Sequence, residues 1–300
     1  MKDKALLNEL VGKAAALVEA LPYMRTFGGK TVVIKYGGAA MVDESLKSGF
    51  ARDISLLKHI GINPVIIHGG GPQIGKTLKN MGIETKFIHG MRVTDEKTIN
   101  VVEEVLVGKV NKEIVRLING HGGKAVGMSG KDGGLIRAEK MYVERSTPET
   151  ERPEIIDIGM VGKVTHVKTS LLKSFEKDGL IPVIAPVGYG ENQETFNINA
   201  DFVAGAIAGA LKAAKLVLLT DEAGILDADG ELISTLTESD ARKLKAGGVI
   251  KGGMSPKVTS CIRALDAGVK KTHIIDGRMK HSVLLEIFTD KGIGTEIVQG

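Results

Sequence analysis

The stretch VIIHGGGPQIGKTL, residues 65–78, joins a short apolar run to three consecutive glycines and then to a pattern typical of a helix. A strand, a glycine-rich turn and a helix in this order are typical of parallel sheets that bind ligands at the strand ends. The same letters satisfy G-x-x-x-x-G-K-[ST], the phosphate loop of P-loop NTPases, through Gly70, Gly75, Lys76 and Thr77. A P-loop NTPase is therefore one interpretation of the segment.

Pro72 argues against a phosphate loop. In such a loop consecutive backbone N–H groups face the phosphates, and proline has no N–H. Proline is favoured at the start of a helix, and a helix that begins at Pro72 places Lys76 and Thr77 about one turn inside it. Two apolar runs that end in aspartate, LVLLTD and HIID, still resemble the second motif of P-loop proteins. These residues alone therefore disfavour a P-loop without excluding it.

Composition indicates a globular protein. The 300 residues suffice for one large domain or two lobes, and the 43% hydrophobic and 25% charged content is ordinary. With 40 basic and 36 acidic residues the net charge is +4, too balanced to indicate a nucleic-acid partner. The single cysteine, Cys261, excludes an internal disulfide and fits a reducing compartment. No Cys or His spacing typical of zinc occurs, so no protein-held metal is predicted.

The N-terminal segment MKDKALLNELVGK lacks the apolar core and cleavage site of a signal peptide. The most apolar stretch, FVAGAIAGALKAAKLVLL, carries two lysines and is more typical of a helix followed by a strand than of a membrane span. We therefore expect a cytoplasmic protein without a membrane partner.

Apolar runs alternate with helical patterns along most of the chain. The runs KTVVIKYGG, NPVIIHGGG, LIPVIAPVG, KLVLLTD and THIID predict strands, and a helix from Ser282 is expected to close the pattern. Residues 122–170 alternate apolar and polar side chains and predict antiparallel hairpins. The alternation predicts an α/β fold, a three-layer αβα sandwich around a mainly parallel sheet, with ligands at the carboxyl ends of the strands.

The N-terminal segment adds a further helix. Apolar residues recur at alternating three- and four-residue spacings, as in a coiled coil, at Leu7, Leu10, Ala14, Leu17 and Leu21. Pro22 is expected to end this helix. The apolar face could pack on its own domain or on a partner helix. A position before the first strand of an otherwise complete fold favours the partner, so residues 1–26 are interpreted as an oligomerisation helix.

Two lysines and an aspartate stand at the ends of predicted elements. Lys35 ends an apolar run directly before a glycine pair, and Lys257 lies in the first turn of a helix preceded by KGGMSP, with Ser255 as the expected N-cap. A helix N-terminus beside paired glycines attracts anions, and a lysine there adds a full charge. Asp201 opens the helix after NINA, where it could complement the helix dipole, orient the two lysines or hold a metal.

The motifs VIKYGGAAM, IIHGGGPQI, MRVTD, SGKDG, GLIRA, FNINAD, LLTDEAGIL and GGMSPKV occur in the order typical of the amino acid kinase family. The chain resembles this family over essentially its whole length. It is most similar to the members that use ATP to phosphorylate the γ-carboxylate of N-acetyl-L-glutamate, the second step of arginine synthesis. The resemblance implies an N-lobe at 27–190 for acyl-substrate binding and dimerisation, and a C-lobe at 191–300 for the nucleotide. It also implies Mg²⁺, held mainly by the nucleotide.

Roles for individual residues follow from the same resemblance. Lys35 and Lys257 would stabilise the transferring phosphoryl group, and Asp201 would orient both. The substrate would be bound by the backbone of Gly70 and Gly71, by Arg92 at its α-carboxylate and by Asn197 near its acetamido group, which leaves Lys76 and Thr77 without a role. The residues implied around the nucleotide are Gly37, Gly38, Thr220, Asp221, Gly224, Ile225, Val249, Lys251 and Gly253.

Family members inhibited by arginine resemble this chain in an N-terminal helix that ends in a segment like YMRTFGG. In those members the helix interlaces dimers into a hexamer, a trimer of dimers, and arginine binds between the helix and the C-lobe. The matching residues here are Tyr23, Lys215, His273, Glu286 and Gly292. Feedback inhibition by L-arginine is therefore expected. Some relatives also bind a PII-type signalling protein, which nothing in this sequence decides.

The chemistry that the resemblance implies suits these residues. A γ-carboxylate with a pKa of about 4.3 is ionised at neutral pH and needs no general base, whereas positive charge is needed to bring it to the γ-phosphate. Aspartokinase, carbamate kinase and uridylate kinase share this fold, and Arg92 with the NINAD segment favours N-acetylglutamate among them. An arginine-binding sensor without activity is a further alternative, which Lys35, Asp201 and Lys257 disfavour.

Overall fold

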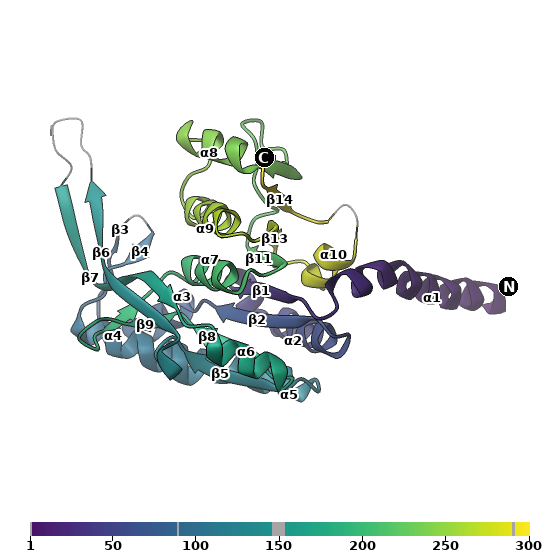
Figure 1. Ribbon diagram of the computed structural model, residues 1–300, viewed down its shortest axis with the longest axis horizontal. Coiled ribbons are helices and arrows are strands. Elements are labelled where there is room, and N and C mark those ends of the chain that lie inside the picture. The colour runs from purple at the N-terminus through teal and green to yellow at the C-terminus, as the bar shows by residue number, and fades with distance from the viewer. Residues whose placement is uncertain (1, 89, 146–153, 290–291) are drawn as a thin grey trace.

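The computed structural model describes residues 2–88, 90–145, 154–289 and 292–300. A central sheet carries helices on both faces, a smaller group of strands lies at one end of the molecule, and a long N-terminal helix extends from the other end (Figure 1). In the described part of the chain, no helix is both long and apolar enough to cross a membrane.

The central sheet has eight strands. In spatial order they are β12 (Thr235–Thr237), β14 (Thr295–Val298), β13 (Lys271–Asp276), β11 (Lys215–Thr220), β1 (Thr31–Tyr36), β2 (Asn63–His68), β8 (Ile181–Ala185) and β5 (Ala125–Ser129). Every neighbouring pair is parallel except β13 and β14. The central strands are buried along almost their whole length, as expected for a parallel sheet covered on both faces.

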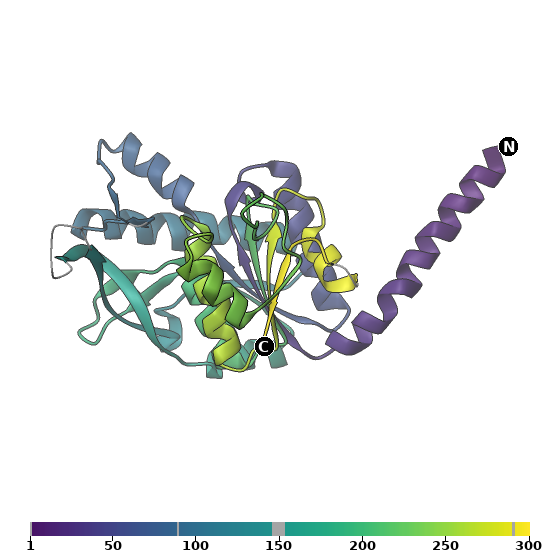
Figure 2. The same cartoon turned by 90° about the horizontal axis from the view of Figure 1, so that it is seen from above.

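Helices cover the two faces of this sheet (Figure 2). One apolar cluster joins it to α2 (Glu44–His59), α3 (Gly71–Asn80), α4 (Glu96–Glu103), the π-helical turn η2 (Glu104–Val110), α5 (Asn111–Gly120) and α10 (Ser282–Phe288). A second cluster joins the opposite face to α6 (Ser170–Lys177), α7 (Ala200–Leu211), α8 (Glu238–Ala246) and α9 (Met254–Asp266). The predicted three-layer αβα sandwich with a mainly parallel sheet is confirmed.

The middle of the chain forms a small barrel. Strands β6 (Ile136–Arg145) and β7 (Glu154–Val167) pair antiparallel, as the alternation between residues 122 and 170 predicts. The sequence analysis did not anticipate that β9 (Val187–Tyr189) and β10 (Thr195–Asn197) close this ribbon into a barrel. The remaining short elements are β3 (Phe87–Ile88), β4 (Met91–Arg92) and the 3-10 turns η1 (Gly38–Met41) and η3 (Asp132–Gly134).

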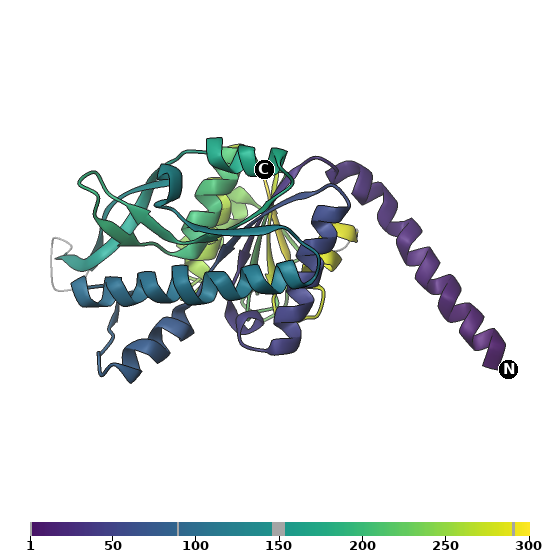
Figure 3. The same ribbon diagram turned by 90° about the horizontal axis from the view of Figure 1, so that it is seen from below.

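The helix α1 (Lys2–Phe27) extends away from the body of the molecule (Figure 3). Four leucines of its apolar seam, Leu7, Leu10, Leu17 and Leu21, are between 42% and 68% exposed. Packing of this seam on its own domain, one of the two expectations, is therefore wrong within the described chain. In the described structure these leucines are exposed to solvent.

Three local expectations differ from the structure. Pro22 does not end α1: the proline leaves the Val18 carbonyl without its intrahelical donor, and in an exposed helix water can bond that carbonyl. Ser255 is not the N-cap of α9, which begins at Met254 after Gly253. Proline at 256 is tolerated because first-turn N–H groups have no partner within the helix. Strand β14 follows α10, so the helix from Ser282 does not close the pattern.

Candidate active site

Strand β1 aims Lys35 at one face of the sheet. Side chains alternate along a strand, so Val32 and Ile34 enter the cluster beneath α2 and α5, whereas Val33 packs beneath α7 and α9. Lys35 shares the side of Val33, and its neighbours in register are Ile67 of β2 and Leu218 of β11. The lysine therefore stands near the carboxyl end of the central strand, facing α7 and α9.

Asp201 joins the two predicted lysines. Its carboxylate oxygens lie 3.2 Å from the Lys35 Nζ and 2.9 Å from the Lys257 Nζ, and all three side chains are almost fully buried. Burial alone would raise the pKa of Asp201, but the two ammonium groups hold that pKa below its ordinary value. Burial lowers the pKa of Lys35, and Asp201 opposes this shift. The structure brings together the three residues to which the sequence analysis gave one site.

The first turn of α7 holds this carboxylate in place. Asn199 caps the helix, and its side-chain oxygen accepts the Asp201 N–H at 2.8 Å. The Ser260 hydroxyl of α9 donates to the Asp201 carbonyl at 2.5 Å. These bonds link α7 to α9, so Lys257 and Asp201 are carried by helices in direct contact. Asn199 and Ser260 were not singled out in the sequence, although the NINAD pattern is typical of an N-cap.

The glycine pair after β1 allows the backbone to pass close to charged groups. A Cβ at Gly37 would lie 2.6 Å from the Lys35 Nζ, and one at Gly38, where φ is +72°, would overlap the Asp221 carboxylate. That carboxylate accepts the Ala39 N–H at 2.5 Å. Asp221, at the end of β11, therefore fastens the turn that follows β1.

The other residues predicted around the nucleotide differ in accessibility. Thr220 ends β11, and its carbonyl accepts the Gly277 N–H at 2.8 Å. The Ile225 side chain is 1% exposed and its N–H and carbonyl are bonded to Thr295 and Ile233, so it offers a ligand no polar group. Gly224 precedes it. Val249, Lys251 and Gly253 lie in the segment between α8 and α9, where Lys251 and Gly253 are exposed.

All four residues predicted to bind the acyl substrate line one cavity of 190 Å³: Gly70, Gly71, Arg92 and Asn197. They come from the start of α3, from β4 and from β10. Asn199 and Ala200 continue the lining to the first turn of α7, directly before Asp201. The cavity and the lysine pair are therefore neighbours.

Arg92 presents an unpaired nitrogen in this region. The guanidinium is buried, its Nη2 donates to the Gly71 carbonyl at 3.1 Å, and it lies 4.6 Å over the Phe87 ring. Its Nη1 is buried and has no hydrogen-bond partner within the described chain. Because buried polar groups are normally satisfied, this nitrogen suits an anion that binds in the cavity. Sequence analysis did not anticipate the stacking on Phe87.

Asn197 is held by Thr94, which lies two residues before α4. Its side-chain nitrogen donates to the Thr94 hydroxyl at 3.3 Å, and that hydroxyl donates to the Arg92 carbonyl at 2.8 Å. Thr94, which was not predicted, therefore couples two of the predicted substrate residues.

The residues of the P-loop pattern lie inside a helix. Helix α3 begins at Gly71 with Pro72 in its first turn, one residue earlier than the sequence predicts. Lys76 is exposed, and the Thr77 hydroxyl donates to the Gln73 carbonyl within the helix at 3.0 Å. The loop backbone that would surround a phosphate is absent from these positions, so the P-loop interpretation is wrong.

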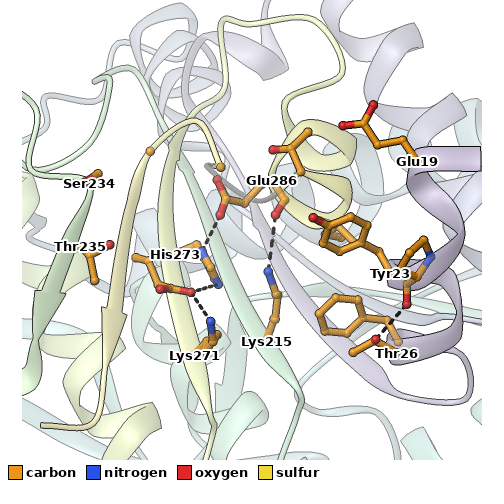
Figure 4. Close-up of a pocket in the computed structure, with 16 residues that line it drawn as sticks. Glu19, Tyr23, Thr26, Lys215, Ser234, Thr235, Lys271, His273 and Glu286 are labelled. Carbon is orange, nitrogen blue, oxygen red and sulfur yellow. Dashed lines mark hydrogen bonds and ion pairs between the residues drawn. The ribbon is translucent and has the colours of Figure 1, made fainter. Parts of the chain in front are cut away.

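A second, larger cavity of 710 Å³ lies between α1 and the carboxyl-terminal strands (Figure 4). Its lining includes all five residues expected to bind an effector: Tyr23, Lys215, His273, Glu286 and Gly292. Gly292 has φ of +60°, and a Cβ there would come within 2.9 Å of the Glu286 carboxylate. The lining also includes Glu19, Thr26, Lys271 and Glu296, which sequence analysis did not single out because they belong to three separate elements.

Charged groups of both signs face each other in this second cavity. The His273 Nδ1 lies 2.6 Å from the Glu286 carboxylate, and Lys271 pairs with Glu296 at 2.8 Å (Figure 4). The Lys215 Nζ donates to the Glu286 carbonyl at 3.4 Å. Burial lowers the pKa values of His273 and Lys215, whereas burial would raise the pKa of Glu286, which His273 holds below its ordinary value.

Among the described residues, no group of three or more His, Cys, Asp or Glu side chains is arranged to hold a metal.

Residues 30–276 match the family model described as Amino acid kinase family. The chain belongs to the amino acid kinase family. This membership confirms the predicted family, and with it the prediction that the chain is an enzyme, a phosphotransferase.

Curated relatives of this amino acid kinase cover nearly its full length. A protein named acetylglutamate kinase from Syntrophus aciditrophicus (strain SB) is 63% identical over 286 residues, 95% of this chain and 97% of the relative. Another with that name, from Syntrophobacter fumaroxidans (strain DSM 10017 / MPOB), is 61% identical over 290 residues, 97% of each chain.

Among solved structures, N-acetylglutamate synthase from Neisseria gonorrhoeae complexed with coenzyme A and N-acetyl-glutamate has a TM-score of 0.81 at 28% identity and covers 96% of this chain. This amino acid kinase spans 63% of the synthase chain. The complex of the same synthase with coenzyme A and L-arginine has a TM-score of 0.79 at 26% identity, over 96% of this chain and 65% of that chain.

Proposed function

We propose that this amino acid kinase transfers the γ-phosphoryl group of ATP to the γ-carboxylate of N-acetyl-L-glutamate, a step of arginine synthesis. The observation that carries the proposal is the buried pair of lysines, joined by Asp201, beside the cavity that contains Arg92. The relatives named acetylglutamate kinase, at 63% and 61% identity, support the choice of substrate.

The reaction requires two anions to meet. A carboxylate oxygen attacks the γ-phosphorus while the bond from that phosphorus to the β,γ-bridging oxygen breaks, and ADP leaves with the electron pair. The nucleophile is already ionised, so no proton has to be removed. Lys35 and Lys257 would neutralise the phosphoryl oxygens, and Asp201 would keep the two ammonium groups apart and in position.

The substrate would lie in the smaller cavity with its α-carboxylate on the free Nη1 of Arg92. The backbone of Gly70 and Gly71, at the N-terminus of α3, would bind its γ-carboxylate, and Asn197 would contact the acetamido group. Residues 27–190 would thus hold most of the acyl substrate and 191–300 most of the nucleotide, with Asn197 of the second part reaching the acyl cavity. Because one continuous sheet joins both parts, the parallel strands β2 and β11 present the acyl and nucleotide sites at the same edge.

ATP would bind at the carboxyl ends of β1 and β11, near the glycine pair and Thr220, and along the segment that leads to Gly253. Mg²⁺ would be held mainly by the phosphates, since the described residues offer no carboxylate cluster for it. The metal would neutralise charge on the phosphates, and Lys35 and Lys257 would do so from the protein side.

Trapping of the acyl phosphate with hydroxylamine tests the proposal directly. With ATP and Mg²⁺, hydroxamate should form from N-acetyl-L-glutamate but not from glutamate or aspartate. Hydroxamate from aspartate would indicate an aspartokinase. If no acid yields hydroxamate, carboxylate phosphorylation is refuted, and a sensor without activity becomes the better interpretation.

The pH dependence of kcat/KM should show an alkaline limb. The pKa of Lys35 is below its ordinary value of 10.5, so this lysine loses its proton, and the site a positive charge, at a lower pH than a free lysine would. We expect kcat/KM to fall with rising pH through a pKa below 10.5. In Lys35→Arg, whose guanidinium stays charged, the limb should move to higher pH. An unchanged limb in this variant would assign the ionisation to another group.

We also propose that L-arginine inhibits the enzyme by binding in the larger cavity. Glu286 and Glu296 suit its guanidinium and ammonium groups, and Lys215 and Lys271 suit its carboxylate. The synthase structure with coenzyme A and L-arginine supports an arginine site in a protein of similar fold.

The exposed leucine seam of α1 would join dimers into a hexamer in the cytoplasm. A PII-type signalling protein is a candidate partner of that hexamer.

Deletion of residues 1–25 should produce a smaller oligomer that arginine does not inhibit. The deletion removes both the leucine seam and Tyr23, which lines the larger cavity. Light scattering and arginine titrations of the hydroxamate assay measure the two effects. A truncated protein that keeps the assembly state and the inhibition of the full chain would refute both roles.

The double variant Leu10→Glu/Leu17→Glu is the matched control, because it places charge on the seam and leaves the cavity residues intact. It should form the smaller oligomer. The assembly role of the seam would be refuted if this variant kept the oligomeric state of the unmodified chain.

A further inference from the structure

His68 is a fully buried histidine beneath the glycines that line the acyl-substrate cavity. It ends β2 and directly precedes Gly69, Gly70 and Gly71. Its Nδ1 lies 2.8 Å from the Gly69 carbonyl oxygen, and a carbonyl can only accept a hydrogen bond. The Nδ1 therefore carries a proton.

Asn111 completes this assignment from the opposite side of the ring. Its side-chain nitrogen lies 3.1 Å from the His68 Nε2 and also donates to the Val183 carbonyl at 2.9 Å. Its oxygen accepts from the Lys112 Nζ at 3.2 Å, which fixes the orientation of the amide. The amide nitrogen has two hydrogens and only donates; the Met128 carbonyl, at 3.4 Å, is the furthest of its three acceptors, so the Nε2 of His68 is one of the two nearer groups that accept. Burial lowers the pKa of His68 to about 4, with a smaller contribution from Lys112, so the ring is neutral at physiological pH.

The bond to the Gly69 carbonyl sets the direction of the next N–H. The carbonyl of Gly69 and the N–H of Gly70 belong to one peptide group, which is trans because the described chain contains no cis peptide bond. In a trans peptide these two groups point in opposite directions. When His68 draws the carbonyl toward the core, the Gly70 N–H is turned away from the core, on the side where the glycines line the cavity. On the other side of Gly69, its N–H donates to the Tyr36 carbonyl at 2.8 Å, so both the N–H and the carbonyl of this glycine are fixed by hydrogen bonds.

The π-helical turn η2 supports this arrangement. It lies directly before Asn111, and its Leu106 packs so closely on Gly70 that a Cβ at that glycine would overlap it. A Cβ at Gly127 would overlap the side-chain oxygen of Asn111, so glycine is needed there as well. A π turn rotates the residues that follow it relative to a regular helix, and such turns are frequent at functional sites.

We infer that His68, held as a single neutral tautomer by Asn111, is a positioning residue that aims the Gly70 N–H at the acyl substrate. This inference rests on the proposed function, in which that N–H binds a substrate carboxylate. His68 touches neither substrate nor nucleotide, and its effect passes through the Gly69–Gly70 peptide.

A pair of amide variants separates this role from general packing. In His68→Asn the side-chain nitrogen stands near the position of Nδ1 and can still donate to Gly69, whereas in His68→Gln it lies further out, near Nε2. We expect KM for N-acetyl-L-glutamate to be about tenfold higher in His68→Gln than in His68→Asn. KM for ATP should agree within about twofold between the two, because in the proposed site the Gly70 N–H binds the acyl substrate and not the nucleotide.

The outcomes are distinct. Absence of turnover by the unmodified enzyme would remove the proposed function and this inference with it. Equal KM values for N-acetyl-L-glutamate in the two variants, beside an active unmodified enzyme, would overturn the inference alone. If either variant fails to fold, nitrogen NMR of the histidine-labelled unmodified protein decides: a proton on Nδ1 of His68 supports the inference, and a proton on Nε2 refutes it.

Discussion

Replacement of Lys35 by alanine should lower kcat by about 10²- to 10³-fold, with little change in KM for either substrate. The ammonium group is buried at the carboxyl end of β1, where it shares Asp201 with Lys257. Its charge is needed most when the phosphoryl group passes between two anions, so its loss should affect the transition state more than the ground state. The hydroxamate assay at saturating ATP and N-acetyl-L-glutamate measures the effect.

Lys76→Ala is the matched control for this variant. Lys76 also belongs to a glycine-rich motif, but it is exposed on α3 and makes no ion pair among the described residues. Its replacement should leave kcat within about twofold of the unmodified enzyme, as is usual for surface sites. Turnover of Lys35→Ala close to that of Lys76→Ala would refute the catalytic role of Lys35. Thermal melts of both variants exclude unfolding as the cause.

Arg92→Ala should raise KM for N-acetyl-L-glutamate by about 10²-fold, while KM for ATP stays nearly constant. The free Nη1 of Arg92 is buried in the cavity, and a carboxylate paired with it would be shielded from water. Loss of a buried charge pair costs about 2–5 kcal/mol, and each 1.4 kcal/mol corresponds to a tenfold change. Initial rates at varied concentrations of each substrate separate the two KM values.

Arg92→Lys serves as the conservative comparison. It keeps the positive charge but loses the planar fork and the stacking on Phe87, so its KM should fall between those of the unmodified enzyme and Arg92→Ala. If both variants raised KM for ATP as much as KM for the acyl substrate, Arg92 would be a structural residue and not a substrate ligand.

Most of the fold is predictable from local pattern. Buried parallel strands such as β1, β2 and β11 are continuous apolar runs, and glycines mark where they end. The closure of β9 and β10 with β6 and β7 was not predictable, because strands of three residues carry too little pattern. The start of α9 was missed because the residue before the helix, Gly253, has no side chain that could cap it, so no capping signal marks this position in the sequence.

The candidate site divides in the same way. Lys35, Asp201 and Lys257 could be selected from their positions at element ends, and the cavity glycines from their clustering. Thr94 and Phe87 could not, although both lie within five residues of Arg92, because their contacts with it depend on the β3–β4 hairpin, which was not predicted. His68 and Asn111 are 43 residues apart and meet only because α5 packs on the central sheet, against β5 and β8. No spacing in the sequence indicates such a pair.

The sequence by itself determined the alternation of strands and helices and the family to which the chain belongs. The alternation depends on the periods of strand and helix, and the family depends on short ordered motifs, and both are local in the sequence. Only the tertiary structure decided that the seam of α1 is exposed and that one carboxylate joins two lysines from separate elements. Those outcomes depend on distances between residues far apart in the chain, which packing sets and local pattern does not contain.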